Sequence, residues 1–253
     1  MNFRAGLSVA MIAAAMQFSF AAQVSAQARV PASEKSAEVS GDLAFGRFIA
    51  LIRGHLLAGD ELVKRRDWSE AYPHFNFPTE EIYGVIRDEL HAYKTPPFDG
   101  DLKALARTVQ ARNARQYPKA WEKVEEALGK ADGALKAKVA SWPRFQVAVA
   151  IEVLKTAAAE YDEAIANGRI AHAVGYRSAR GFVLQAGRMI DAAAPDLPAG
   201  NGAELGEIRA GLARLNAAFI APSAPDRPPI DDAELAAVMT QIEAAAARLR
   251  PPL

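Results

Sequence analysis

Histidines and acidic residues are concentrated in the stretch from Gly54 to Tyr93, which holds three of the four histidines of the chain. The chain contains no cysteine, so imidazoles and carboxylates are the strong transition-metal ligands it can offer. These side chains bind Fe, Cu, Zn or Mn, and helical bundles build such sites from facing helices. The cluster therefore predicts a metal site with His55, His74 and Glu81 as ligands and Asp60 as a ligand or a supporting neighbour.

Each predicted ligand also has a structural explanation. His55 lies at the edge of an apolar helical stripe, so its buried ring needs a partner, which is either a metal ion or a carboxylate. His74 follows Pro73 and precedes a predicted helix start, in a loop from which its side chain can turn inward. Glu81 suits a first helical turn through the dipole alone. Asp60 is offset from the face of His55, so a shared site must form across helices.

The remaining histidines are predicted to be surface residues. His91 shares a helix face with charged side chains, and His172 stands alone after a glycine. Glu152, Glu160 and Glu163 are alternative acids from the second half of the chain. Their spacing with a neighbouring lysine favours an ordinary solvated helix face.

The N-terminus has the pattern of an export signal. Arg4 is followed by an apolar run over 7–22 and by small residues suited to cleavage at 24–26. We expect a cleavable signal peptide over 1–26, a flexible segment over 27–40, and a periplasmic mature protein. No later segment reaches the roughly 18 to 20 apolar residues that a membrane span requires.

Apolar residues recur at helical spacing through the rest of the chain, and sustained alternation typical of strands is missing. The pattern predicts an all-α helical bundle of about seven to nine helices over 41–253. It forms either one core or two packed sub-bundles, 41–140 and 143–253. The first predicted helices run from about Asp42 to Lys64, from Asp67 to a stop before Pro73, and from Glu80 to Tyr93.

Charge and motifs exclude several classes of function. The chain has 30 basic and 30 acidic residues and no basic block, which argues against a nucleic-acid or anionic-membrane partner. Zincin, serine-hydrolase, phosphate-loop and dinucleotide motifs are missing, and so is the motif for covalent haem attachment. We therefore expect no haem and no nucleotide. Catalysis has no positive support, and a hydrolase that uses the histidine cluster is the third interpretation.

A family resemblance rests on the signal sequence, the cysteine-free helical body and the pair Gly54 and His55 in the first long helix. In these features the chain resembles the imelysin-like proteins, which are periplasmic helical bundles associated with iron uptake. The family motif is Gly-x-His-x-x-Glu, whereas here His55 follows Gly54 directly and Ala58 stands where the glutamate belongs. Only His55 therefore maps onto the motif.

Two functional hypotheses follow. The leading one is an exported protein that binds iron, copper or zinc for uptake or homeostasis, with a membrane metal permease or another envelope protein as its partner. The alternative is a non-catalytic scaffold of the cell envelope. It would use a helical-repeat-like surface around 68–72, where the sequence resembles a tetratricopeptide hairpin without the sustained period.

Overall fold

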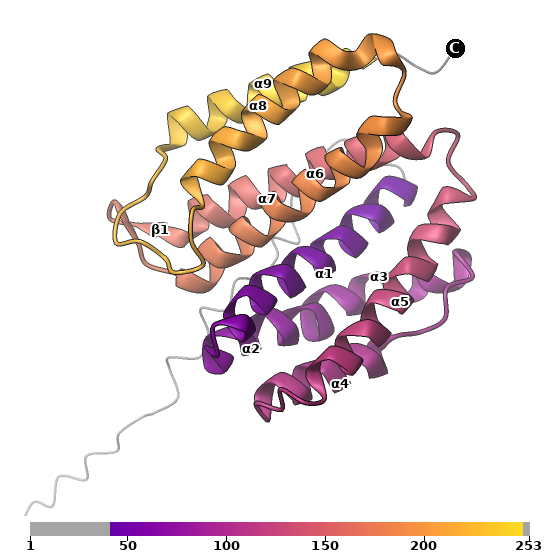
Figure 1. Cartoon of the computed structure of the whole chain (residues 1–253), viewed down its shortest axis with the longest axis vertical. Coiled ribbons are helices and arrows are strands. Elements are labelled where there is room, and N and C mark those ends of the chain that lie inside the picture. The colour runs from indigo at the N-terminus through magenta and orange to yellow at the C-terminus, as the bar shows by residue number, and fades with distance from the viewer. Residues whose placement is uncertain (1–40, 250–253) are drawn as a thin grey trace, which may run out of the picture.

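The computed structural model describes residues 41–249 (Figure 1). The predicted signal peptide over 1–26 and the flexible segment over 27–40 lie outside the described residues. The α-helices are α1 (Gly41–Lys64), α2 (Trp68–Phe77), α3 (Tyr83–Ala92), α4 (Asp99–Gln110), α5 (Tyr117–Lys136), α6 (Trp142–Ala164), α7 (Ala173–Ala193), α8 (Gly202–Ala218) and α9 (Asp232–Ala247). Shorter elements are the π-helix η1 (Pro78–Ile82), the 3-10 turns η2 (Ala194–Asp196) and η3 (Ala199–Asn201), and the strands β1 (Ile165–Ala166) and β2 (Arg169–Ile170).

The all-α prediction is confirmed. Helices α8 and α9 form an outer layer on α6 and α7, while α1 lies between that pair and the α2 to α5 group (Figure 1). Helix α1 contacts α2 and α5 on one side and α6 and α7 on the other. The buried hydrophobic side chains of both groups form one continuous cluster.

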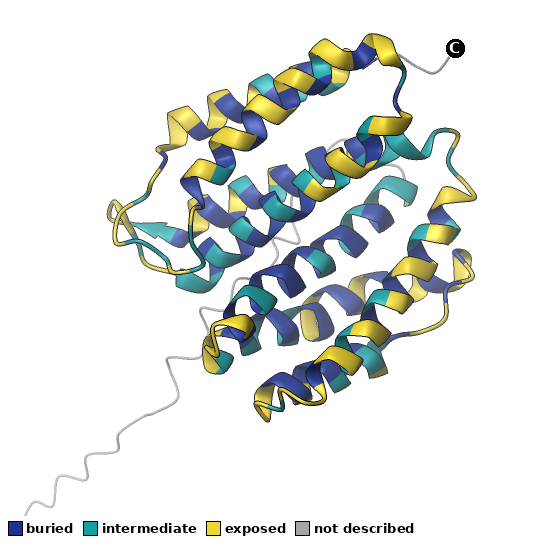
Figure 2. Ribbon diagram, in the orientation of Figure 1, coloured by how far each residue is buried: buried dark blue, intermediate teal, exposed yellow. Residues whose placement is uncertain are grey.

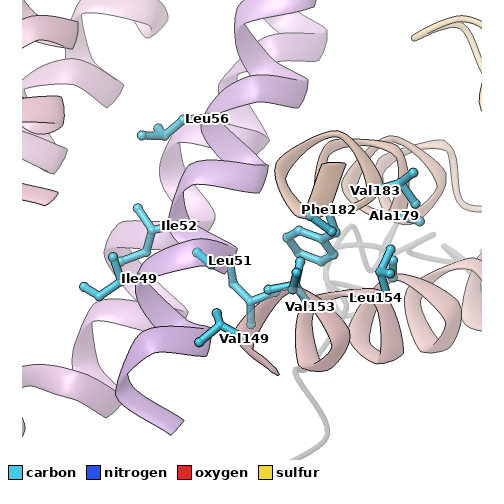
Figure 3. Packing of buried hydrophobic residues seen from close by; sticks show 14 of the residues in the cluster. Ile49, Leu51, Ile52, Leu56, Val149, Val153, Leu154, Ala179, Phe182 and Val183 are labelled. Atoms are coloured by element: carbon cyan, nitrogen blue, oxygen red, sulfur yellow. The ribbon is translucent and has the colours of Figure 1, made fainter. Parts of the chain in front are cut away.

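Helix α1 is the central element because its apolar residues are not confined to one stripe. Residues 49–52 and 54–59 are buried without interruption (Figure 2). A helix that is apolar around its whole circumference is stable only when other helices surround it. Figure 3 shows Leu51 of α1 pointing toward Val153 of α6, while Ile52 and Leu56 point to the opposite side of α1.

Two glycines let α1 and α7 approach backbone to backbone. A Cβ at Gly181 would lie 2.2 Å from the carbonyl oxygen of Gly54, and a Cβ at Gly54 would lie 2.4 Å from the ring of Phe182. No real side chain tolerates such distances. The crossing therefore requires a residue without a side chain on both helices.

Helices α6 and α7 are joined by a short hairpin that the sequence analysis did not predict. Asn167 and Gly168 both have positive φ, at 55° and 70°, between the two-residue strands β1 and β2. This is the conformation that a two-residue hairpin loop demands and that Asn-Gly adopts readily. Asn167 and Gly168 therefore form a tight reversal between α6 and α7.

Ion pairs fix α7 against the first two helices. Arg180 makes a two-pronged contact with Glu61 of α1, at 2.8 and 2.6 Å, and also donates to the carbonyl of Phe219. Arg177 pairs with Glu70 of α2 at 2.7 Å. These contacts hold α1, α2 and α7 together around the region described next.

Candidate functional site

The structure brings His55 and His74 together from neighbouring helices. His55 lies on α1 and His74 on α2, with ring centres 6.1 Å apart. Both are excluded from solvent, with 4% and 0% of their surface exposed. The close approach of the two helices depends on Gly59, where a Cβ would lie 2.4 Å from the ring of Phe75.

His55 has mostly aromatic surroundings. Its ring stacks on Phe77, at 5.6 Å between centres, and meets the edge of Phe182 at 4.9 Å. Its Nδ1 lies 3.4 Å from the hydroxyl oxygen of Ser178 on α7. This long contact is the one polar interaction of His55 within residues 41–249.

Neither ring nitrogen of His74 has a hydrogen-bond partner among the described residues, although both are buried. Neutral imidazole carries one donor and one acceptor nitrogen. Most buried polar groups in proteins are paired, and leaving one unpaired costs free energy. A histidine with both nitrogens unpaired is therefore the most conspicuous unsatisfied group in this part of the fold.

Burial keeps both imidazoles neutral. It lowers the pKa of His55 from 6.5 to about 3. Burial also lowers the pKa of His74 well below 6.5, and the positive charges of protonated His55 and of Arg177 lower it further. Arg177 itself is paired with Glu70. Neutral imidazole is the form that donates a nitrogen lone pair to a metal ion.

The backbone near His74 departs from the sequence prediction. The helix predicted to stop before Pro73 continues to Phe77, so His74 lies inside a helix and not in a loop. The π-helix over 78–82 follows directly, so the helix predicted to begin at Glu80 starts as a π-helical turn and becomes an α-helix at Tyr83. Pi-helical turns are rare and occur frequently at functional sites.

The two predicted carboxylate ligands lie elsewhere. The carboxylate of Asp60 accepts a hydrogen bond from the hydroxyl of Tyr117 at 3.0 Å and pairs with Lys64 at 2.6 Å. Glu81 is exposed on the π-helix. Within residues 41–249 no group of three or more His, Asp or Glu side chains is placed to hold a metal ion. Of the four predicted ligands, the structure brings together the two histidines.

The surface predictions hold for His91, His172 and Glu163 and fail for Glu160, while Glu152 is half-buried. His91 and His172 are exposed. Glu160, predicted to lie on a solvated face, is buried with 7% of its surface exposed. Burial, and secondarily the charge of Glu163, raises the pKa of Glu160 to about 7. The sequence pattern missed this because Glu160 faces the N-terminal turn of α7 near Gly175.

Sequence reasoning also missed the contribution of α7. Ser178, Phe182 and Arg177 complete the surroundings of the histidine pair, more than a hundred residues after His55. The one signal in the sequence is the group of small residues Gly54, Ala58 and Gly59, which allows another helix to pack closely against α1. It does not identify which helix packs there.

The fold and site together define a helical bundle with a buried pair of neutral imidazoles at the junction of its two helical groups. Residues 136–252 match the family model of the iron permease-associated 4-helix bundle domain. The match covers α6 to α9, and the matching domain is described as associated with an iron permease. It supports an iron-uptake helical bundle and gives the imelysin-like proteins no specific support. No curated protein and no solved structure showed a significant match.

The matched segment contains Ser178 and Phe182 but neither His55 nor His74. The candidate site is therefore built where the matched four helices meet the preceding ones. No helix among residues 41–249 has the length and apolar character needed to cross a membrane.

Proposed function

We propose that this chain is an exported accessory protein of iron uptake and that His55 and His74 bind a transition-metal ion. The observation that carries the proposal is that both nitrogens of His74 are buried and unpaired beside a second neutral imidazole. A metal ion shared by the two rings would satisfy one nitrogen of each. The match to an iron permease-associated domain supports a role in metal uptake.

The separation of the two rings fits one shared ion. An ion lies about 2.0 to 2.1 Å from an imidazole nitrogen, and hence about 3.1 to 3.2 Å from the ring centre. Two rings on one ion therefore have centres at most about 6.4 Å apart. The observed 6.1 Å lies within this limit.

The proposed site rests on the two imidazoles. Asp60 would have to leave Tyr117 and Lys64 to join it, and Glu81 would have to turn inward from solvent. The proposal also includes the periplasmic location, which rests on residues 1–26, and a membrane iron permease as partner. The proposed kinship with the imelysin-like proteins rests on the signal sequence, the cysteine-free helical body and the pair Gly54 and His55.

The test is a calorimetric titration of the full chain, as processed by an expressing host and purified without a polyhistidine tag. Fe(II), Cu(II), Cu(I) and Zn(II) are each titrated, the oxidisable ions without oxygen. We expect one ion per chain, with binding lost in His55→Phe and in His74→Phe. His91→Phe and His172→Phe are matched controls because these rings are exposed, and both should bind as wild type does.

Binding that survives both buried substitutions would show that the site lies elsewhere. If no ion binds above the background of scattered surface groups, the envelope scaffold becomes the better account. The aromatic residues of its predicted surface, Trp68 and Tyr72, are half-buried and pack against the chain's own core. That arrangement leaves less of this surface free for a partner than the scaffold hypothesis expects.

A further inference from the structure

The surroundings of the histidine pair restrict the charge of the ion it can hold. The walls next to His55 are the rings of Phe77 and Phe182, and the nearest polar group is the Ser178 hydroxyl. We propose that the site is selective for monovalent copper, Cu(I), bound by one nitrogen each of His55 and His74. This inference rests on the proposed function, because it names the ion for the same site.

The first argument concerns charge. The cost of moving an ion from water into an apolar interior rises with the square of its charge, and nearby anions normally offset it. Here both donors are neutral, and no carboxylate joins them among the described residues. The charge of Arg177 acts on His74, and Arg177 is already paired with Glu70. A divalent or trivalent ion would keep its full charge in these surroundings, whereas Cu(I) brings the smallest charge.

The second argument concerns coordination number. Structural Zn²⁺ takes four ligands, and hard cations require a shell of oxygen donors. The surroundings offer two imidazole nitrogens and one hydroxyl. Cu(I) has a filled d shell and accepts two nitrogen donors in a nearly linear arrangement. It is therefore the common biological ion whose ligand requirement these surroundings can meet.

The third argument concerns the angle between the donors. With nitrogens about 2.0 to 2.1 Å from the ion, ring centres would lie about 5.1 Å apart at a tetrahedral angle and about 6.3 Å apart in a linear arrangement. The observed separation of 6.1 Å is close to the linear limit. One ion shared by the rings at this separation would therefore have both donor nitrogens near the line that joins the two ring centres, which is a wide angle at the ion.

The experiment compares ions of different charge on the same protein. Ag(I), an air-stable monovalent ion with the same preference for two nitrogen donors, is titrated as the nitrate in chloride-free buffer. Cu(I) is supplied without oxygen in competition with a chromophoric Cu(I) chelator, and Zn(II) and Fe(II) are titrated separately. We expect one equivalent of Ag(I) or Cu(I) to bind at least 100-fold more tightly than Zn(II) or Fe(II).

Variants assign the binding to the histidines. Monovalent-ion binding should be lost in His55→Phe and His74→Phe. It should persist in the double variant Met189→Leu, Met239→Leu, which removes both methionine sulfurs of residues 41–249. Circular dichroism checks that each variant folds, and His74→Leu replaces His74→Phe if the larger ring does not fit. The ratio of Ag(I) affinity to Zn(II) affinity in the wild-type protein tests whether the site prefers a monovalent ion, and this test needs no variant.

The outcomes separate the two proposals. Equal or tighter binding of Zn(II) or Fe(II) through the same two histidines would overturn the inference and leave the proposed function standing. Binding of Ag(I) that survives the histidine substitutions and disappears in the methionine variant would overturn both. No ion bound at one equivalent would also overturn both.

Discussion

Replacing His74 with phenylalanine is expected to stabilise the metal-free protein while it removes metal binding. Substitution of a fully buried side chain normally destabilises a protein. His74 differs because its two buried nitrogens have no partner among the described residues. Phenylalanine keeps an aromatic ring in these aromatic surroundings and removes both unsatisfied groups.

The expected gain is the difference between two effects. An unsatisfied buried donor or acceptor costs about 1–3 kcal/mol, so removing both nitrogens gains about 2 kcal/mol at the low end. Phenylalanine is larger than histidine, and overpacking a core costs about 1–3 kcal/mol. We expect a net gain of about 1 kcal/mol, which raises the Tm by about 2–4 °C in a domain of this size.

The assay is urea and thermal unfolding of wild type, His74→Phe and His74→Leu in the presence of a metal chelator. His91→Phe, at an exposed position, is the matched control and should change the free energy of unfolding by less than about 0.5 kcal/mol. Loss of more than about 2 kcal/mol in both buried variants would refute the reasoning. It would mean that the nitrogens of His74 are satisfied in solution, for example by buried water.

Two further predictions concern the helix crossing and the response to pH. Gly181→Ala should lower the free energy of unfolding by about 3 kcal/mol, because its methyl group would lie 2.2 Å from the Gly54 carbonyl oxygen. Gly187→Ala, on the same helix with open space around it, should raise the free energy of unfolding by about 0.5–1 kcal/mol. Urea unfolding midpoints measure both changes, and equal effects of the two variants would contradict the close crossing of α1 and α7. The pKa of His55 is lowered to about 3, so its contribution to stability is complete above about pH 6.5 and falls below it by up to about 1.4 kcal/mol per pH unit. The pKa of Glu160 is raised to about 7, so its contribution is present at low pH and is lost as pH rises through about 7. As pH falls from about 6.5 to 5, Glu160→Gln should therefore lose stability more steeply than wild type, and His55→Phe should lose it less steeply. The measurement is the free energy of unfolding in urea across this pH range. If both variants show the same dependence of this free energy on pH as wild type, these groups are not buried as described.

Much of the fold was predictable because helical periodicity is a local property of the sequence. The long apolar pattern from Asp42 to Lys64 predicted α1, and the structure confirms it. The predicted stop before Pro73 was wrong because packing overrides local preference. Ala71, His74 and Phe75 are buried together on α2. This burial stabilises the helix enough to offset the backbone hydrogen bond that Pro73 cannot donate, so the helix continues beyond Pro73.

The site was only partly predictable, because its members meet through tertiary packing. The apolar stripe of α1 indicated that His55 would be buried, and this is confirmed. Its pairing with His74 depends on the close α1 and α2 contact at Gly59, which periodicity does not specify. The partner of Asp60 is Tyr117, 57 residues further along the chain. No sequence spacing predicts that hydrogen bond.

The most direct test of the central claim follows the imidazole nitrogens of all four histidines during addition of Ag(I). In ¹⁵N-labelled wild-type protein, one ring nitrogen each of His55 and His74 should shift together and stop shifting at one equivalent. His91 and His172, which are exposed, serve as internal controls and should not change before that point. Shifts that begin at the exposed histidines, or that leave His55 and His74 unchanged, would contradict the proposal that the buried pair binds a metal ion.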